Sequence, residues 1–165
     1  MTTKRLTELS LLTAAALIIF IVELRLPDLS AIPGVKLGLA NIITVFAVYR
    51  YTAKEAGLIV VTRVLLGSIF GGNLSAVLYS MAGAVCCLVG MLLMKHILPP
   101  AYLWLCSIFG AIFHNTGQIA AALLITRTFA VLGYFPVLMI SGCAAGLFTG
   151  LCAQTVLTRL ERRQR

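Results

Sequence analysis

Long apolar segments separated by short polar turns constrain this chain more than any other feature of its sequence. A helix needs about 20 apolar residues to cross the hydrocarbon core of a bilayer. Hydrophobic residues make up 61% of the 165 residues and charged residues only 11%. That charged fraction is too small for the surface of a soluble domain. The sequence therefore predicts an all-α membrane protein in which residues 1–165 form a single integral-membrane domain.

The apolar segments predict six transmembrane helices, since the chain has room for about six such spans with short loops. The second predicted span is short and polar at its start, after a turn at Pro33 and Gly34. We expect Asn41 to lie about one turn inside this helix. The six predicted spans are Leu6–Leu26, Leu37–Tyr49, Ala56–Phe70, Leu74–Met94, Tyr102–Ile125 and Phe135–Leu157.

The distribution of lysine and arginine predicts the orientation of the chain, because these residues are enriched in cytoplasmic loops. With six spans and a cytoplasmic N-terminus, three basic residues lie outside, Arg25, Lys36 and Arg127, and Arg63 lies within a span. The inside holds nine, namely Lys4, Arg5, Arg50, Lys54, Lys95, Arg159, Arg162, Arg163 and Arg165. Both termini are therefore predicted to be cytoplasmic, in a prokaryotic plasma membrane. The same distribution accounts for the net charge of +8 without nucleic-acid binding.

The sequence offers no recognisable catalytic motif, so we expect a protein that is not an enzyme. It contains no nucleophile elbow, phosphate-binding loop, HExxH motif or paired aspartates. The histidines, His96 and His114, are predicted on opposite sides of the membrane and cannot share a metal. The five cysteines lie in apolar segments without a CxxC pair, which favours packing roles over disulfides or zinc. We expect no catalytic residues, metal or cofactor.

Polar residues from several predicted elements fall at one level, in the outer half of the bundle. His114 is about 18 Å from the start of its helix, from a rise of 1.5 Å per residue. Asn115 and Gln118 follow it, and we expect all three to project from one side. The candidate substrate-binding residues are Lys36, Asn41, Arg63, Asn73, His114, Asn115 and Gln118.

Two interpretations of these polar residues remain open. Each residue could be a local contact between helices, as in a pairing of Glu23 with Arg63. Alternatively, they line one site, because ionisable groups inside a membrane are functional by default. The set carries net positive charge and would suit an anionic or carbonyl-rich ligand with an apolar body. The glycines Gly142, Gly146 and Gly150 indicate close helix packing, either within the bundle or against a partner subunit.

Three sequence segments resemble the Gx transporter family, which is also labelled heptaprenyl diphosphate synthase component I. They are Ile-Pro-Gly-Val-Lys-Leu-Gly-Leu-Ala-Asn at 32–41, Arg63 with Gly67-Ser-Ile-Phe-Gly71, and His-Asn-x-x-Gln at 114–118. That family is similar to the S components of energy-coupling factor (ECF) vitamin transporters. The resemblance implies an S-component-like bundle of six helices with both ends inside and a ligand pocket near the outer face.

The resemblance also implies partners and a function. We expect a substrate-binding subunit that works with a transmembrane T subunit and two cytoplasmic ATPases to take up a small ligand. The alternative is a non-catalytic membrane subunit associated with prenyl diphosphate or quinone synthesis, or with a flavin-linked redox complex. One departure is that S components commonly dock through Ala-x-x-x-Ala on the first helix, where the nearest match here is Ser10-x3-Ala14.

Overall fold

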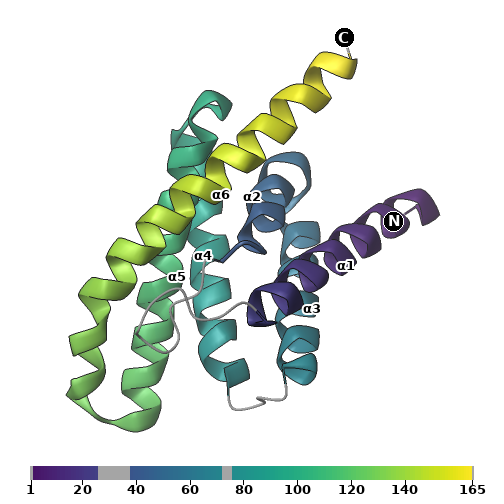
Figure 1. Cartoon of the computed structure of the whole chain (residues 1–165). Helices are drawn as coiled ribbons and strands as arrows, with labels where there is room; N and C mark the ends of the chain where they lie inside the picture. Colours follow the sequence, from purple (N-terminus) through teal and green to yellow (C-terminus); the bar gives the residue numbers. More distant parts are fainter. Residues whose placement is uncertain (1, 26–37, 72–75, 165) are drawn as a thin grey trace.

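The computed structural model describes residues 2–25, 38–71 and 76–164, and these residues form helices and connecting turns without a strand (Figure 1). This confirms the all-α prediction. The six α-helices are α1 (Thr3–Arg25), α2 (Asn41–Arg50), α3 (Ala53–Phe70), α4 (Ala76–Ile97), α5 (Leu103–Thr126) and α6 (Phe135–Gln164). Two short 3-10 helices, η1 (Pro100–Tyr102) and η2 (Phe129–Tyr134), precede α5 and α6.

Four of the six helices are long and apolar enough to cross a membrane. The corresponding segments are Thr3–Glu23, Val77–Ile97, Pro100–Thr126 and Phe129–Arg162. Helix α2 has only 10 residues, about 15 Å at the rise of an α-helix. Helix α3 has 18 residues but carries Lys54, Glu55 and Arg63. The chain therefore has the helices of a multi-pass membrane protein, with two of the six predicted spans shorter or more polar than the others.

The short helix α2 is the central element of the bundle. It contacts each of the other five α-helices, whereas α5 packs mainly against α4 and α6, and α1 mainly against α3. Val45, Ala47 and Val48 of α2 are fully buried and belong to the main hydrophobic core. In Figure 1, α2 lies behind the long diagonal of α6 and beside α1. The shortest α-helix is therefore the one that all the other α-helices contact.

The beginning of α2 differs from the sequence prediction, because Asn41 is its first residue rather than a residue one turn inside. Gly38 has a positive φ of 64°, a conformation that glycine adopts without steric cost. The Asn41 amide then donates to the Gly38 carbonyl at 2.8 Å, and the Ile42 amide donates to the Leu39 carbonyl at 3.1 Å. This tight turn occupies the residues that the apolar pattern assigned to the helix.

The ends of α4 and α6 also extend beyond their predicted limits. Lys95 and His96 belong to the last turn of α4, although the sequence places them in a loop. The two prolines at 99 and 100 disfavour helical conformation only at the residue before them and at themselves. Helix α6 likewise continues to Gln164. Part of the predicted loop 126–134 is the 3-10 helix η2.

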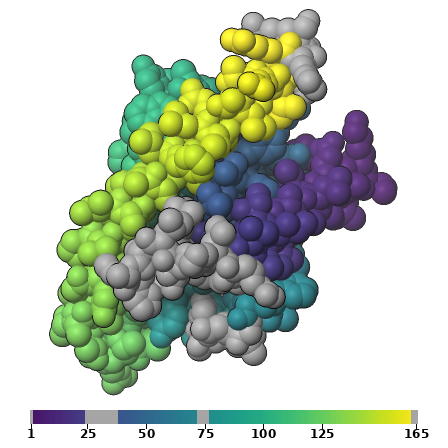
Figure 2. Space-filling model, viewed as in Figure 1, coloured from purple at the N-terminus to yellow at the C-terminus, as the bar shows by residue number. Residues whose placement is uncertain are grey.

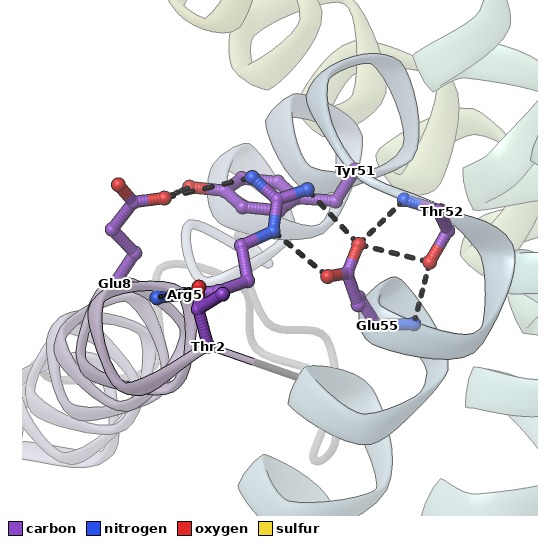
Figure 3. Close-up of polar contacts among 6 residues, drawn as sticks. All are labelled: Thr2, Arg5, Glu8, Tyr51, Thr52 and Glu55. Atoms are coloured by element: carbon purple, nitrogen blue, oxygen red, sulfur yellow. Dashed lines mark hydrogen bonds and ion pairs between the residues drawn. The ribbon is translucent and has the colours of Figure 1, made fainter.

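Side-chain contacts join helix ends and turns at one end of the bundle. Figure 3 shows the first turn of α1 beside the start of α3, where Arg5 donates to both carboxylate oxygens of Glu55 at 2.8 and 3.0 Å. The Arg5 guanidinium also lies 4.1 Å from the centre of the Tyr51 ring. Gln154 of α6 donates to the carbonyl of Ala101 in η1 at 2.7 Å. The N-terminus, the α2–α3 turn, η1 and the later part of α6 therefore share one end.

The outer surface of the bundle is apolar. Ile140, Phe148 and Leu151 of α6 are exposed, along the helix that runs diagonally from the lower left to the upper right in Figure 2. Such a large exposed apolar surface suits lipid rather than water. By contrast, Gly142, Gly146 and Gly150 face α5, where a methyl group at Gly150 would lie 2.6 Å from the Trp104 Cα. The glycine stripe therefore packs inside the bundle.

Candidate functional site

Arg63 is a buried cation at the centre of the candidate site. It lies on α3 and has only 8% of its surface exposed. Its Nη2 donates to Oδ1 of Asn41 at 3.4 Å, which joins α3 to the first residue of α2. Its Nε makes no hydrogen bond within the described part of the chain. A buried guanidinium with a single long bond to a neutral amide keeps most of its capacity to bind an anion.

Glu23 on α1 does not form the ion pair with Arg63 that one of the two open interpretations of the polar residues included. Its carboxylate accepts hydrogen bonds from the backbone amides of Gly38 and Leu39, the latter at 3.1 Å, and only 8% of the residue is exposed. These amides precede α2, where helix dipole and free N–H groups favour a negative charge. Glu23 interacts with Arg63 electrostatically over a longer distance. The carboxylate, which comes from a different helix, therefore holds the turn that leads into α2.

The opposite end of α2 is held by Lys95. Its Nζ donates to the carbonyl of Val48 at 2.7 Å and lies 5.7 Å from the centre of the Tyr49 ring. A cation at the C-terminal end of a helix compensates the dipole there, as an anion does at the N-terminal end. The distribution of lysine and arginine in the sequence assigned Lys95 to a cytoplasmic loop and did not indicate this contact. The contact became visible only in the structure, where Lys95 lies in the last turn of α4.

His114 and Gln118 of α5 lie on the face that packs against α4. Gly83 of α4 makes room for them, because a methyl group there would lie 2.6 Å from the Gln118 Cγ and 2.9 Å from the His114 carbonyl oxygen. The buried Nδ1 of His114 has no hydrogen-bond partner among the described residues. His114 and Arg63 interact electrostatically. The recorded packing contacts of His114 and Gln118 are with Gly83 of α4.

Asn115 faces another helix. Its Nδ2 donates to the carbonyl of Leu138 in α6 and packs against Gly142. Asn115 is rotated by about 100° from His114 on α5, and its contacts are with α6, whereas His114 and Gln118 lie against Gly83 of α4. The prediction that all three project to one side is therefore wrong for Asn115. The structure therefore brings Asn41 together with Arg63, and His114 with Gln118, but directs Asn115 to the α5–α6 interface. Lys36 and Asn73 lie outside the described residues.

The described residues contain no group of three His, Cys, Asp or Glu side chains that could hold a metal ion. The five cysteines are free thiols. What the site offers is the Arg63 guanidinium, the Asn41 amide, a histidine nitrogen and the backbone amides before α2. Such groups bind and orient an anionic or carbonyl group. The candidate list from the sequence did not contain Glu23, which binds the amides before α2, or Lys95, which binds the other end of that helix.

A comparison with protein families matches residues 12–156 to the family described as heptaprenyl diphosphate synthase component I. No curated protein and no solved structure matches the chain. The matched region includes α2, α3, α4 and α5, and with them every described residue of the candidate site. The chain therefore belongs to the heptaprenyl diphosphate synthase component I family.

Proposed function

We propose that this chain is the substrate-binding membrane subunit of an ECF-type transporter and captures a small anionic or amphipathic ligand. The observation that carries the proposal is the buried cation Arg63, whose described hydrogen-bond partner is the neutral amide of Asn41. Removing a cation from water without a close counterion costs several kcal/mol. A ligand anion would provide that counterion. Ionisable residues inside membrane bundles typically mark substrate paths.

The energy for uptake would come from partner subunits. The sequence contains no phosphate-binding loop for ATP, and the resemblance to S components implies a transmembrane T subunit and two cytoplasmic ATPases. In this proposal the chain binds its ligand near the outer face and catalyses no reaction. Arg63, Asn41, His114 and Gln118 contact the ligand. Asn115 stabilises the α5–α6 interface.

The description of the matched family favours a second candidate function. In this alternative the chain is a non-catalytic membrane subunit associated with prenyl diphosphate or quinone synthesis, or with a flavin-linked redox complex. A prenyl diphosphate has an anionic head and an apolar tail, so it would also suit a buried arginine. The two functions differ in the partners that the chain requires.

Native mass spectrometry of the gently purified protein tests both functions. The transporter proposal expects a co-purified small molecule, and a T subunit with two ATPases in the intact complex. A complex with a prenyl diphosphate synthase or a flavoprotein instead would support the alternative. In liposomes, the purified chain alone should bind its ligand but not accumulate it. Robust accumulation without any added partner would contradict the transporter proposal.

A further inference from the structure

Glu23 occupies a position that is chemically suited to an external anion. Its carboxylate oxygens accept from two consecutive backbone amides, those of Gly38 and Leu39. These amides lie in the turn before Ala40, the residue that precedes the 10-residue helix α2. Consecutive backbone amides in a turn that includes a positive-φ residue such as Gly38 form concave sites for phosphate and carboxylate groups. Glu23 reaches this turn from α1, 15 and 16 residues earlier in the chain.

Arg63 points to the same end of α2 from α3. Its guanidinium bonds to Asn41, the first residue of the helix, and its Nε has no hydrogen-bond partner in the described segments. Only 8% of the surface of Arg63 is exposed, so its guanidinium lies in a region of low dielectric constant. The guanidinium can bind a further anionic partner there. The Glu23 carboxylate thus lies on two amides of the turn, and the Arg63 guanidinium bonds to Asn41 at the end of the same turn.

We propose that the Gly38–Leu39 turn before α2, with Arg63, binds one carboxylate or phosphate group of a ligand, and that Glu23 is a built-in competitor that fills this site in the ligand-free chain. The ligand group would replace the Glu23 carboxylate on the Gly38 and Leu39 amides and would bond to Arg63. Two negative groups cannot share this small region, because like charges at close range repel strongly when they are buried. This inference takes from the proposed function that the chain binds a ligand. It concerns only the site that binds the anionic group of that ligand.

The competition has a physical advantage for a binding protein. An empty anion site at a buried helix end would leave two amides unsatisfied at a cost of about 1–3 kcal/mol each. Glu23 satisfies them until a ligand arrives. Its displacement would also release the outer end of α1, whose other end remains fixed by the Arg5–Glu55 pair. Ligand binding would thereby change how α1 is held in the bundle.

The test uses the full chain in dodecyl maltoside, with inorganic phosphate and acetate as probes. Phosphate binding is followed by 31P NMR and by the unfolding midpoint. Glu23→Gln should bind phosphate about tenfold to a hundredfold more tightly than the wild type, because one charge-assisted competitor is removed. Arg63→Gln should lose binding in both backgrounds. Glu161→Gln removes the same charge from an exposed position on α6 and should leave the affinity unchanged.

A second measurement avoids dependence on the stability of Glu23→Gln. The chain has four glutamates, Glu8, Glu23, Glu55 and Glu161, so 13C-carboxyl glutamate labelling gives four signals that Glu→Gln variants at the other three positions assign by elimination. In the wild type, phosphate should shift the Glu23 signal and leave that of Glu161 in place. Titration in nanodiscs of neutral lipid, with and without phosphatidylglycerol, distinguishes a free anion from a lipid headgroup.

Two outcomes would overturn the inference. One is a folded Glu23→Gln variant that binds phosphate no more tightly than the wild type. The other is a Glu23 carboxyl signal that does not respond while phosphate binds through Arg63; this second outcome removes the competitor but leaves the ligand site of the proposed function intact. Conversely, competition by Glu23 in a chain that supports no uptake with T and ATPase partners would sustain the inference and refute the transport function.

Discussion

Two arginines of this protein illustrate how position decides what a charged residue does. Arg5 lies at the end of the bundle, half-exposed, and has a carboxylate at 2.8 Å together with the ring of Tyr51 (Figure 3). Arg63 is buried and has only an amide as hydrogen-bond partner among the described residues. The first arrangement is a local clamp between α1 and α3. The second is the kind of incomplete arrangement that a ligand completes.

The Arg5–Glu55 clamp predicts a specific dependence of stability on pH. Hydrogen bonds from Arg5, and then from the backbone and hydroxyl of Thr52, lower the pKa of Glu55 from 4.5 to about 2. A carboxyl whose pKa is lower in the folded state stabilises that state above pH 4.5 and loses this contribution as the pH falls toward 2. Glu55→Gln should therefore lower the unfolding midpoint at pH 7 and reduce its decrease between pH 5 and pH 3. Equal decreases in the variant and the wild type would contradict the prediction.

A second residue-level prediction separates ligand binding from helix packing. Arg63→Gln and Gln118→Ala should each weaken the binding of the co-purified ligand roughly tenfold to a hundredfold, since a lost hydrogen bond in a dry site costs about 1–3 kcal/mol. Asn115→Ala is the matched control, because Asn115 bonds to Leu138 across the α5–α6 interface. It should lower the unfolding midpoint and leave the affinity unchanged. Ligand retention in native mass spectrometry and thermal unfolding measure the two effects.

At the scale of elements, the short helix α2 depends on its neighbours for its ends. Glu23 of α1 satisfies the amides before it, and Lys95 of α4 satisfies the Val48 carbonyl near its end. Free helix ends are costly where water cannot reach them. The glycines provide the complementary feature, since they allow α4, α5 and α6 to approach closely. Charged caps and small residues thus fix how the helices meet.

The packing of α4 against α5 can be tested with two glycines. A methyl group at Gly117 would lie 2.8 Å from both the Ala82 carbonyl oxygen and the Cys86 Sγ, whereas one at Gly57 of α3 would lie at an ordinary 3.5 Å from Leu88. Gly117→Ala should therefore destabilise the fold by about 1–3 kcal/mol through overpacking. Gly57→Ala should be neutral or stabilise it by up to about 1 kcal/mol through helix propensity. Similar unfolding midpoints for both variants would argue against this packing.

At the scale of the whole molecule, the described contacts bring the N-terminus, the α2–α3 turn, η1 and the later part of α6 to one end. Under the predicted topology, nine lysines and arginines belong to this end and three to the other. We therefore propose, from the positive-inside rule, that this end faces the cytoplasm. The candidate anion site, at the beginning of α2, lies away from it.

Single-cysteine labelling in a cysteine-free background tests this orientation. Cysteines at Gly71 and Thr128 should react with an impermeant reagent added to intact cells. Cysteines at Lys54 and His96, which are exposed in the structure, should react only after the membrane is permeabilised. The expectation follows from the charge distribution and from the alternation of helix ends. Labelling of His96 from outside would reverse or invalidate the assignment.

The sequence by itself determined the membrane class, the number of helices and most of their limits, because the length of an apolar segment is a local property. It also identified Arg63 and Asn41 as candidates, and the structure joins them by a hydrogen bond. Only the tertiary structure decided that Glu23 binds the turn before α2, that Lys95 holds the other end of this helix, and that Asn115 faces α6 while His114 faces α4. These contacts join residues 15 to 47 positions apart. They depend on how each helix is rotated and how deeply it packs, and an apolar pattern on nearly every face does not encode that rotation.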